Sequence, residues 1–164
     1  MRVALISEHA SPLACLGGVD AGGQNVYVGQ LAKHLARRGW SVDVFNRRDS
    51  PDLPEVCDFG GARVVQVPAG PPERVRKVDL LPYMGPSTEV FLWYAKRRGG
   101  HDVAHANFFM SVLVAAEAKR ETGLPFAVTF HALGKVRRLH QGARTPSPPS
   151  GWLSRSGRWP RPTE

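Results

Sequence analysis

The stretch GGVDAGGQNVYV, residues 17–28, follows a short apolar run and opens an amphipathic segment. The apolar run, Val3 to Ile6, has the length and character of a buried strand. Beyond the stretch, apolar side chains recur at the spacing of one helix face: Val28, Leu31, Ala32 and Leu35. The sequence therefore predicts a strand, a glycine-bearing loop and a helix in succession.

Two glycine pairs mark this loop, and the second pair, Gly22 and Gly23, is followed by the small amides Gln24 and Asn25. We expect these two glycines to adopt dihedral angles closed to other residues and to leave their N–H groups unshielded. The first turn of the next helix adds unpaired N–H groups and the positive end of the helix dipole. Such a place suits a phosphate or a sugar hydroxyl, whereas the alternative is a merely flexible turn.

The loop does not fit the dinucleotide-binding fingerprint, in which G-x-G-x-x-G follows the strand in a tight turn. Here the residues from Glu8 to Leu16 separate the strand from the first glycine, and the glycine spacing is GG-x-x-x-GG. A Rossmann oxidoreductase is therefore disfavoured. The loop is also long enough to reach over a ligand.

The remaining chain alternates strand-like and helical segments. Strands are predicted at 2–7, 41–45, 63–67, 101–106 and 126–130, and helices at 24–38, 87–98 and 110–122. Residues 50–61 are predicted to be a loop, and residues 68–86 an ordered loop or a lid with a basic cluster that includes Lys77. Strands alternating with helices across short connections indicate an α/β protein with a Rossmann-like, doubly wound parallel sheet.

Polar residues end three of the predicted strands: Ser7, Glu8 and His9, then His105 and Asn107, and then His131. Ligands of such sheets bind beyond the carboxyl ends of the strands, so these residues and the glycine loop are expected to share one rim. A lone histidine at a strand end is more often a local hydrogen-bonding residue. Several polar strand ends beside a glycine loop favour a binding site instead.

Composition narrows the classes of protein. No run approaches the ~20 apolar residues of a membrane-spanning helix. The apolar core at the start of the chain is too short for a signal peptide, so we expect a cytoplasmic protein. Cys15 and Cys57 are isolated, which predicts reduced thiols and no metal site. The net charge of +8 is concentrated in residues 135–164, with 7 basic and 1 acidic side chains, so nucleic acid is not an expected partner of the domain.

Three segments resemble the N-terminal domain of retaining glycosyltransferases of the GT-B fold, family 4: residues 17–39, HANFFMS at 105–111 and TFHALGKVRRLHQG at 129–142. The sequence is similar to sucrose-phosphate synthase-like and mycothiol-pathway transferases over about residues 1–143. The resemblance implies transfer of a glycosyl group from a nucleotide-sugar to a sugar or sugar-phosphate acceptor with retention of configuration. It implies no bound metal and no other cofactor.

The rim and the resemblance together predict substrate-binding residues: Gly22, Gly23, Gln24, Asn25, Lys77, His105, Asn107 and Arg137. The resemblance implies that His131 is the catalytic residue, beside the donor sugar. It also implies that Lys77 and Arg137 bind phosphate. Phe108 and Ala132 stand where the inositol-phosphate transferases have tyrosine and threonine hydroxyls, and each lost hydroxyl forfeits about 1.5–3 kcal/mol. This difference disfavours inositol phosphate and favours a sugar-phosphate acceptor.

The resemblance implies a second, donor-binding domain after residue 143. Residues 144–164 instead lack apolar periodicity and are predicted to be a disordered basic tail. Back-translation with GC-rich codons and a shift of one base gives a family-like continuation, so we interpret the tail as frameshift-derived. The alternative is a basic arm for nucleic acid or for peripheral contact with a membrane.

We expect the chain to be the acceptor-binding domain and to be inactive without the missing C-terminal domain, its natural partner. A competing hypothesis is a stand-alone sugar-phosphate-binding or docking module without catalysis. The two differ in whether a separately encoded or in-frame donor-binding domain accompanies the chain.

Overall fold

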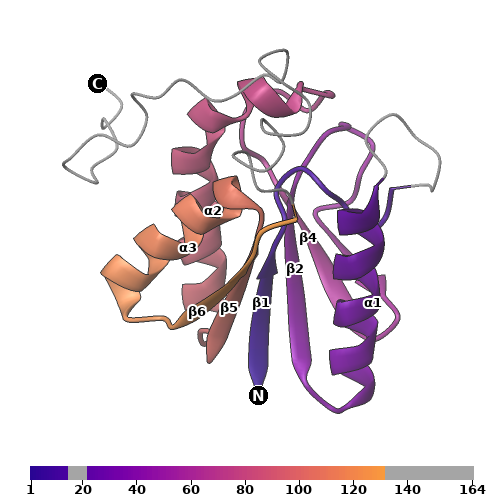
Figure 1. Ribbon diagram of the computed structural model, residues 1–164, viewed down its shortest axis with the longest axis vertical. Helices are drawn as coiled ribbons and strands as arrows, with labels where there is room; N and C mark the ends of the chain where they lie inside the picture. The colour runs from indigo at the N-terminus through magenta and orange to yellow at the C-terminus, as the bar shows by residue number, and fades with distance from the viewer. Residues whose placement is uncertain (15–21, 132–164) are drawn as a thin grey trace, which may run out of the picture. The chain divides into compact units, whose positions relative to one another are not determined.

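A six-stranded sheet with the order β3-β4-β2-β1-β5-β6 lies at the centre of the computed structural model, which describes residues 1–14 and 22–131 (Figure 1). The strands are β1 (Arg2–Ile6), β2 (Ser41–Arg47), β3 (Val56–Phe59), β4 (Ala62–Val67), β5 (Val103–Asn107) and β6 (Phe126–Thr129). Within these described ranges every pairing is parallel except that of β3 with β4. The prediction of an α/β fold with a doubly wound parallel sheet is confirmed.

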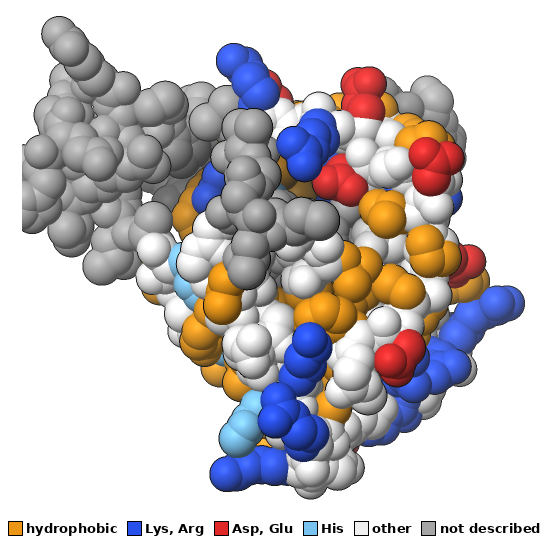
Figure 2. Space-filling model, turned by 90° about the vertical axis from the view of Figure 1, so that its right-hand side faces the viewer, with side chains coloured by type: hydrophobic (Ala, Val, Ile, Leu, Met, Phe, Trp, Pro, Cys, Tyr) orange, Lys and Arg blue, Asp and Glu red, His pale blue; other side chains and the backbone are white. Residues whose placement is uncertain are grey.

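Helices cover both faces of the sheet. α1 (Gly23–Arg37) lies on one face, and α2 (Met84–Arg97) and α3 (Phe109–Thr122) lie on the other (Figure 1). Two short 3-10 turns, η1 (Lys77–Asp79) and η2 (Leu81–Tyr83), lead into α2. Figure 2 shows the α1 side, where hydrophobic side chains gather in the middle and a group of Lys and Arg lies at the lower end.

The alternation of side chains along the strands builds one apolar layer against each face. Val28 and Ala32 of α1 pack on alternate residues of three strands: Val3, Leu5, Val42, Val44, Ala62 and Val64. On the other face, Phe45 of β2 contacts the rings of Phe91 and Tyr94, with centroids 4.7 and 5.3 Å away. Each fully buried side chain of this kind stabilises the fold by about 1.5–3 kcal/mol.

The sequence-based prediction is wrong at two places. Residues 50–61, expected to be a loop, contain β3, which pairs antiparallel with β4. Gly60 and Gly61 connect the two strands with φ of 64° and 87°, and a two-residue hairpin turn favours glycine at such angles. α2 begins at Met84 rather than at residue 87, because Pro86 in the first helical turn gives up an N–H that has no intrahelical partner.

A row of polar side chains crosses the carboxyl-terminal end of the sheet, and we call it the polar row: Gln66, Asn46, Ser7, Asn107 and Thr129. The strand register pairs Asn46 with Gln66 and Asn107 with Thr129. Ser7 directly follows β1, which pairs with β2 and with β5, so it lies between the two pairs. The apolar layer beneath α1 therefore ends in polar groups at the rim of the sheet.

Gln66 is the member of the polar row whose replacement is expected to stabilise the fold. Its side chain is 1% exposed, and within the described part of the chain neither amide atom forms a hydrogen bond. A buried unpaired polar group costs about 1–3 kcal/mol, so Gln66→Met is expected to raise the free energy of unfolding by a similar amount. Chemical denaturation measures this change.

Gln24→Met is the matched control. Gln24 is also buried, but its Nε2 donates to Ser7 Oγ at 3.2 Å and to Asn107 O at 3.3 Å. Its replacement is therefore expected to lower stability. Equal destabilisation by the two variants would contradict the prediction for Gln66.

Candidate functional site

The predicted rim residues lie together at the carboxyl-terminal end of the sheet. His131 Nε2 is 3.1 Å from Asn107 Oδ1, and Gln24 of α1 donates to the Asn107 carbonyl. The ring of Tyr27, also on α1, contacts His131 and His105 edge-on, with centroids 5.0 and 6.2 Å away. Residues from α1, from β5 and from the end of β6 thus share one site.

Gly22 and Gly23 do not have the special dihedral angles expected of them. Gly22 has φ −130° and ψ −170°, which any residue adopts, and Gly23 opens α1 without a positive φ. What these glycines leave is room: apart from their chain neighbours and the helix backbone, no described atom lies within 4 Å of a Cβ built on either residue, as at several other glycines of the chain. Among the described residues, glycine at these positions thus leaves open space beside the N-terminus of α1 rather than shaping the backbone.

The first turn of α1 has fewer free donors than expected. The Gly22 N–H donates to Asn25 Oδ1 at 3.0 Å, and Asn25 Nδ2 donates to the Ser11 carbonyl at 2.9 Å. Asn25 therefore caps the helix and ties down the loop after β1. The N–H groups of Gly23 and Gln24 have no hydrogen-bond partner among the described residues, and they lie at the positive end of the helix dipole.

Phe108 brings two basic side chains into the site. The Lys77 ammonium lies 3.6 Å from the centroid of the Phe108 ring, and the His9 ring packs edge-on against it at 4.9 Å. Among the described residues, Phe108 is the one non-glycine residue with a positive φ. Its φ is 80° and its ψ is 161°. This backbone region belongs almost entirely to glycine and costs a larger residue about 1–3 kcal/mol.

The loop that carries Lys77 is tied to the sheet by Arg47 at the end of β2. Arg47 is buried, with 4% of the residue exposed. Its guanidinium donates hydrogen bonds to the carbonyls of Pro71 and Glu73, at 2.7 and 2.5 Å. Five donors in a planar fork suit such simultaneous bonds. Residues 68–86, expected to be an ordered loop or a lid, contain η1, η2 and the first residues of α2.

Glu8 and Ser111 also belong to the site, although no specific role was predicted for either residue. Glu8 is 4% exposed, and its Oε1 lies 2.9 Å from His9 Nδ1. Its other carboxylate oxygen accepts from the Ser111 hydroxyl on α3. Because both oxygens are engaged, Glu8 orients His9 rather than presenting a free carboxylate to a ligand.

The two rim histidines are held neutral. Burial lowers the pKa of His105, and the neighbouring His131 lowers it further. Burial also lowers the pKa of His131, with added repulsion from His9 and Lys77. At neutral pH the rim histidines therefore act by hydrogen bonding.

Some predicted features lie outside the described residues: Arg137, Ala132, Cys15 and the tail 144–164. In the part of the chain that is described, no group of three or more His, Cys, Asp or Glu side chains is arranged to hold a metal ion. None of the described helices is both long enough and apolar enough to cross a membrane.

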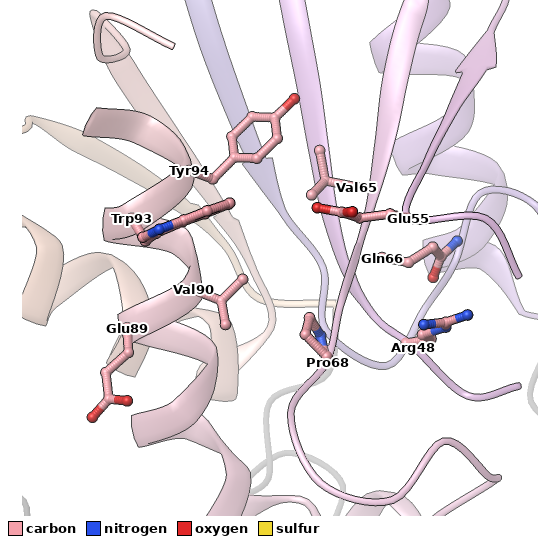
Figure 3. A pocket seen from close by; sticks show the side chains of 9 residues that line it. All are labelled: Arg48, Glu55, Val65, Gln66, Pro68, Glu89, Val90, Trp93 and Tyr94. Carbon is pink, nitrogen blue, oxygen red and sulfur yellow. The ribbon is translucent and has the colours of Figure 1, made fainter. Parts of the chain in front are cut away.

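A separate pocket of about 560 Å³ lies between β4 and α2 (Figure 3). Val90, Trp93 and Tyr94 of α2 form one side of it, and Val65 and Pro68 lie across from them (Figure 3). None of the predicted site residues lines this pocket. The predicted site residues are therefore separate from this pocket, although Gln66 of the polar row also lines it.

Comparison with known proteins identifies the family. The family of glycosyl transferase 4-like domains matches residues 22–161. D-inositol 3-phosphate glycosyltransferase 1 of Catenulispora acidiphila is 43% identical over 139 residues, which cover 83% of this chain and 32% of that protein. The D-inositol 3-phosphate glycosyltransferase of Actinosynnema mirum is 40% identical over 141 residues, covering 84% of this chain and 34% of that protein.

Among solved structures, sucrose-phosphate synthase from Thermosynechococcus elongatus matches with a TM-score of 0.80 and 33% identity, over 84% of this chain and 35% of that one. This chain thus spans about a third of the length of the relatives that it matches. The resemblance seen in the sequence is confirmed, and the chain belongs to the family of glycosyl transferase 4-like domains.

Proposed function

We propose that the rim binds the acceptor of a glycosyltransferase, a sugar or polyol that carries a phosphate. The observation that carries the proposal concerns the described residues: they leave open space at Gly22 and Gly23, beside N–H groups of Gly23 and Gln24 that have no partner among them. A helix N-terminus with free N–H groups and room for a ligand is a favourable place for an anion. The relatives are named for D-inositol 3-phosphate and sucrose phosphate, which supports a phosphorylated ligand.

The surrounding side chains supply complementary chemistry. The Lys77 ammonium adds a positive charge on a flexible stem, which suits a phosphate. Gln24 uses both hydrogens of its Nε2 in bonds to the protein, so its Oε1 is the atom left for a ligand hydroxyl. His131 lies at the same rim, where the donor sugar meets the acceptor in this proposal, and its imidazole binds a sugar hydroxyl there.

In the proposed reaction the glycosyl group comes from a nucleotide-sugar and keeps its anomeric configuration. N–H groups and basic side chains stabilise the charge that develops on the leaving diphosphate, without a metal ion. In this proposal a further domain supplies most of the donor site, and the rim described here binds the acceptor. Phe108 has no hydroxyl, and this favours a hexose phosphate over D-inositol 3-phosphate as the acceptor.

Titration of the ¹⁵N-labelled chain tests the proposal. The ligands are glucose 6-phosphate, D-inositol 3-phosphate, glucose and inorganic phosphate. We expect the phosphorylated polyols to shift the amide signals of Gly23 and Gln24, and glucose alone to shift them much less. Absence of binding by every phosphorylated ligand would overturn the proposal.

Lys77→Met tests the charge at the site. Loss of a hydrogen bond to a charged group is worth about 1.5–3 kcal/mol, so the dissociation constant of the phosphorylated ligand is expected to rise at least about tenfold. Lys33→Met is the matched control, because the Lys33 ammonium also lies over a phenylalanine ring, that of Phe59 at 4.3 Å. Equal weakening by both variants would mean that the phosphate is not held at Lys77.

A further inference from the structure

We infer that Asn107 is a positioning residue that fixes the proton of neutral His131 on Nε2, so that Nδ1 faces the ligand as a hydrogen-bond acceptor. The inference rests on the proposed function only in its second half, the meeting of Nδ1 with a ligand. The first half concerns the protein alone. It follows from the hydrogen bonds of the buried Asn107 amide.

The orientation of the Asn107 amide is determined by its neighbours. The residue is fully buried, at 0% exposure, in the polar row. Its Nδ2 lies 3.4 Å from the Ile6 carbonyl oxygen and 3.2 Å from the His105 carbonyl oxygen. Carbonyl oxygens only accept, so the NH₂ group must face them and Oδ1 must point the other way.

Asn107 Oδ1 in turn determines where His131 carries its proton. Oδ1 is 3.1 Å from His131 Nε2, and an amide oxygen can only accept, so Nε2 must donate. A neutral imidazole has one N–H group, and its other nitrogen is an acceptor. Burial lowers the pKa of His131, and repulsion from His9 and Lys77 lowers it further, which favours the neutral ring.

Two further contacts hold the pair in place. The Tyr27 ring packs edge-on against His131 at an interplanar angle of 67°, which restrains the plane of the imidazole. The Asn107 carbonyl accepts from Gln24 Nε2, which links the residue to the first turn of α1. Within the described part of the chain His131 Nδ1 forms no hydrogen bond, so it is the nitrogen available to a ligand.

The consequence is a site that selects a donating group at this point. A ligand hydroxyl that donates its hydrogen to Nδ1 fits the site. An O-methyl or fluoro substituent at the same position offers no hydrogen and leaves Nδ1 unpaired. Asn107 would thus contribute to ligand choice without touching the ligand.

Nuclear magnetic resonance of the ligand-free chain, labelled with ¹⁵N-histidine, tests the assignment. At pH 7.5 we expect His131 to show a protonated Nε2 and an unprotonated Nδ1, with no averaging between the two forms. In Asn107→Ala the ¹⁵N shifts of His131 should move toward averaged values and its Nε2 proton should exchange faster with water. His101, whose Nε2 lies 2.9 Å from Asp43 Oδ2, is the internal control and should keep its pattern.

Asn107→Asp is the second variant, since it keeps the oxygen that accepts from Nε2 and adds a negative charge. It should preserve the Nε2–H form and raise the titration midpoint of His131 by about one pH unit or more. A protonated Nδ1 in the unmodified chain, or an unchanged His131 pattern in Asn107→Ala with no rise of the midpoint in Asn107→Asp, would overturn the inference.

Addition of glucose 6-phosphate or D-inositol 3-phosphate then tests the second half. Binding that shifts the Gly23 amide and also the Nδ1 signal supports it. Binding that shifts the Gly23 amide but leaves the Nδ1 signal unchanged would show that Nδ1 accepts no hydrogen bond from the ligand. The second half of the inference would then be overturned, while the proposed function stands. Failure of both compounds to bind overturns the proposed function, whereas the proton position is already decided by the ligand-free spectrum.

Discussion

Gly23→Ala is expected to weaken the binding of a phosphorylated ligand about a hundredfold without destabilising the fold. The added methyl group meets no described atom within 4 Å, and Gly23 has helical dihedral angles without a positive φ, so the chain accommodates alanine. Replacing glycine by alanine in a helix even stabilises it by about 0.5–1 kcal/mol. In the proposed complex, however, the methyl group occupies the space through which a phosphate reaches the N–H groups of Gly23 and Gln24.

Isothermal calorimetry with glucose 6-phosphate and thermal denaturation measure the two effects separately. Gly85→Ala is the matched control, because Gly85 is the second residue of α2 and also has no atom within 4 Å of a built Cβ. We expect it to match Gly23→Ala in stability and the unmodified chain in affinity. Unchanged affinity in Gly23→Ala would mean that the ligand does not approach the N-terminus of α1.

Phe108→Tyr is expected to tighten the binding of D-inositol 3-phosphate by about ten- to a hundredfold. The substitution keeps the ring that Lys77 and His9 contact, and it keeps the strained backbone at φ 80°. It adds one hydroxyl at the position where the inositol-phosphate transferases are expected to have a tyrosine. One hydrogen bond to a charged phosphate is worth about 1.5–3 kcal/mol, which sets the size of the effect.

Calorimetric titration with D-inositol 3-phosphate and glucose 6-phosphate gives the change in preference between the two ligands. Phe109→Tyr adds the same hydroxyl to the neighbouring ring, whose centroid is 4.7 Å from that of Phe108, and controls for added polarity nearby. It is expected to leave both affinities close to those of the unmodified chain. If Phe108→Tyr left the preference between the two ligands unchanged, the phosphate would not bind at this ring.

The sheet and its helices could be predicted because their signals are local in the sequence. Apolar runs and helical periodicities identified every parallel strand and all three described α-helices to within a few residues. β3 was missed since its residues alternate between exposed and half-buried at the edge of the sheet. Its place in the fold depends on the glycine turn and on pairing with β4. The four residues of β3 do not specify that pairing by themselves.

The place of the site also follows from the sequence, but its internal order does not. The rule that ligands bind beyond the carboxyl ends of parallel strands brought His105, Asn107 and His131 to one rim. The contact of Glu8 with Ser111 joins residues 103 positions apart, and the strain at Phe108 appears only in the dihedral angles. Such features depend on tertiary packing, and no local sequence pattern predicts them.

The anchoring of residues 71–73 by Arg47 has a consequence for the energetics of recognition. A loop that must settle on its ligand loses conformational freedom at the moment of association, and that loss weakens affinity. Here the segment that leads to Lys77 is immobilised by a buried guanidinium before any ligand arrives. The entropy of ordering it is lost when the chain folds, so the attraction between ammonium and phosphate counts more fully toward complex formation.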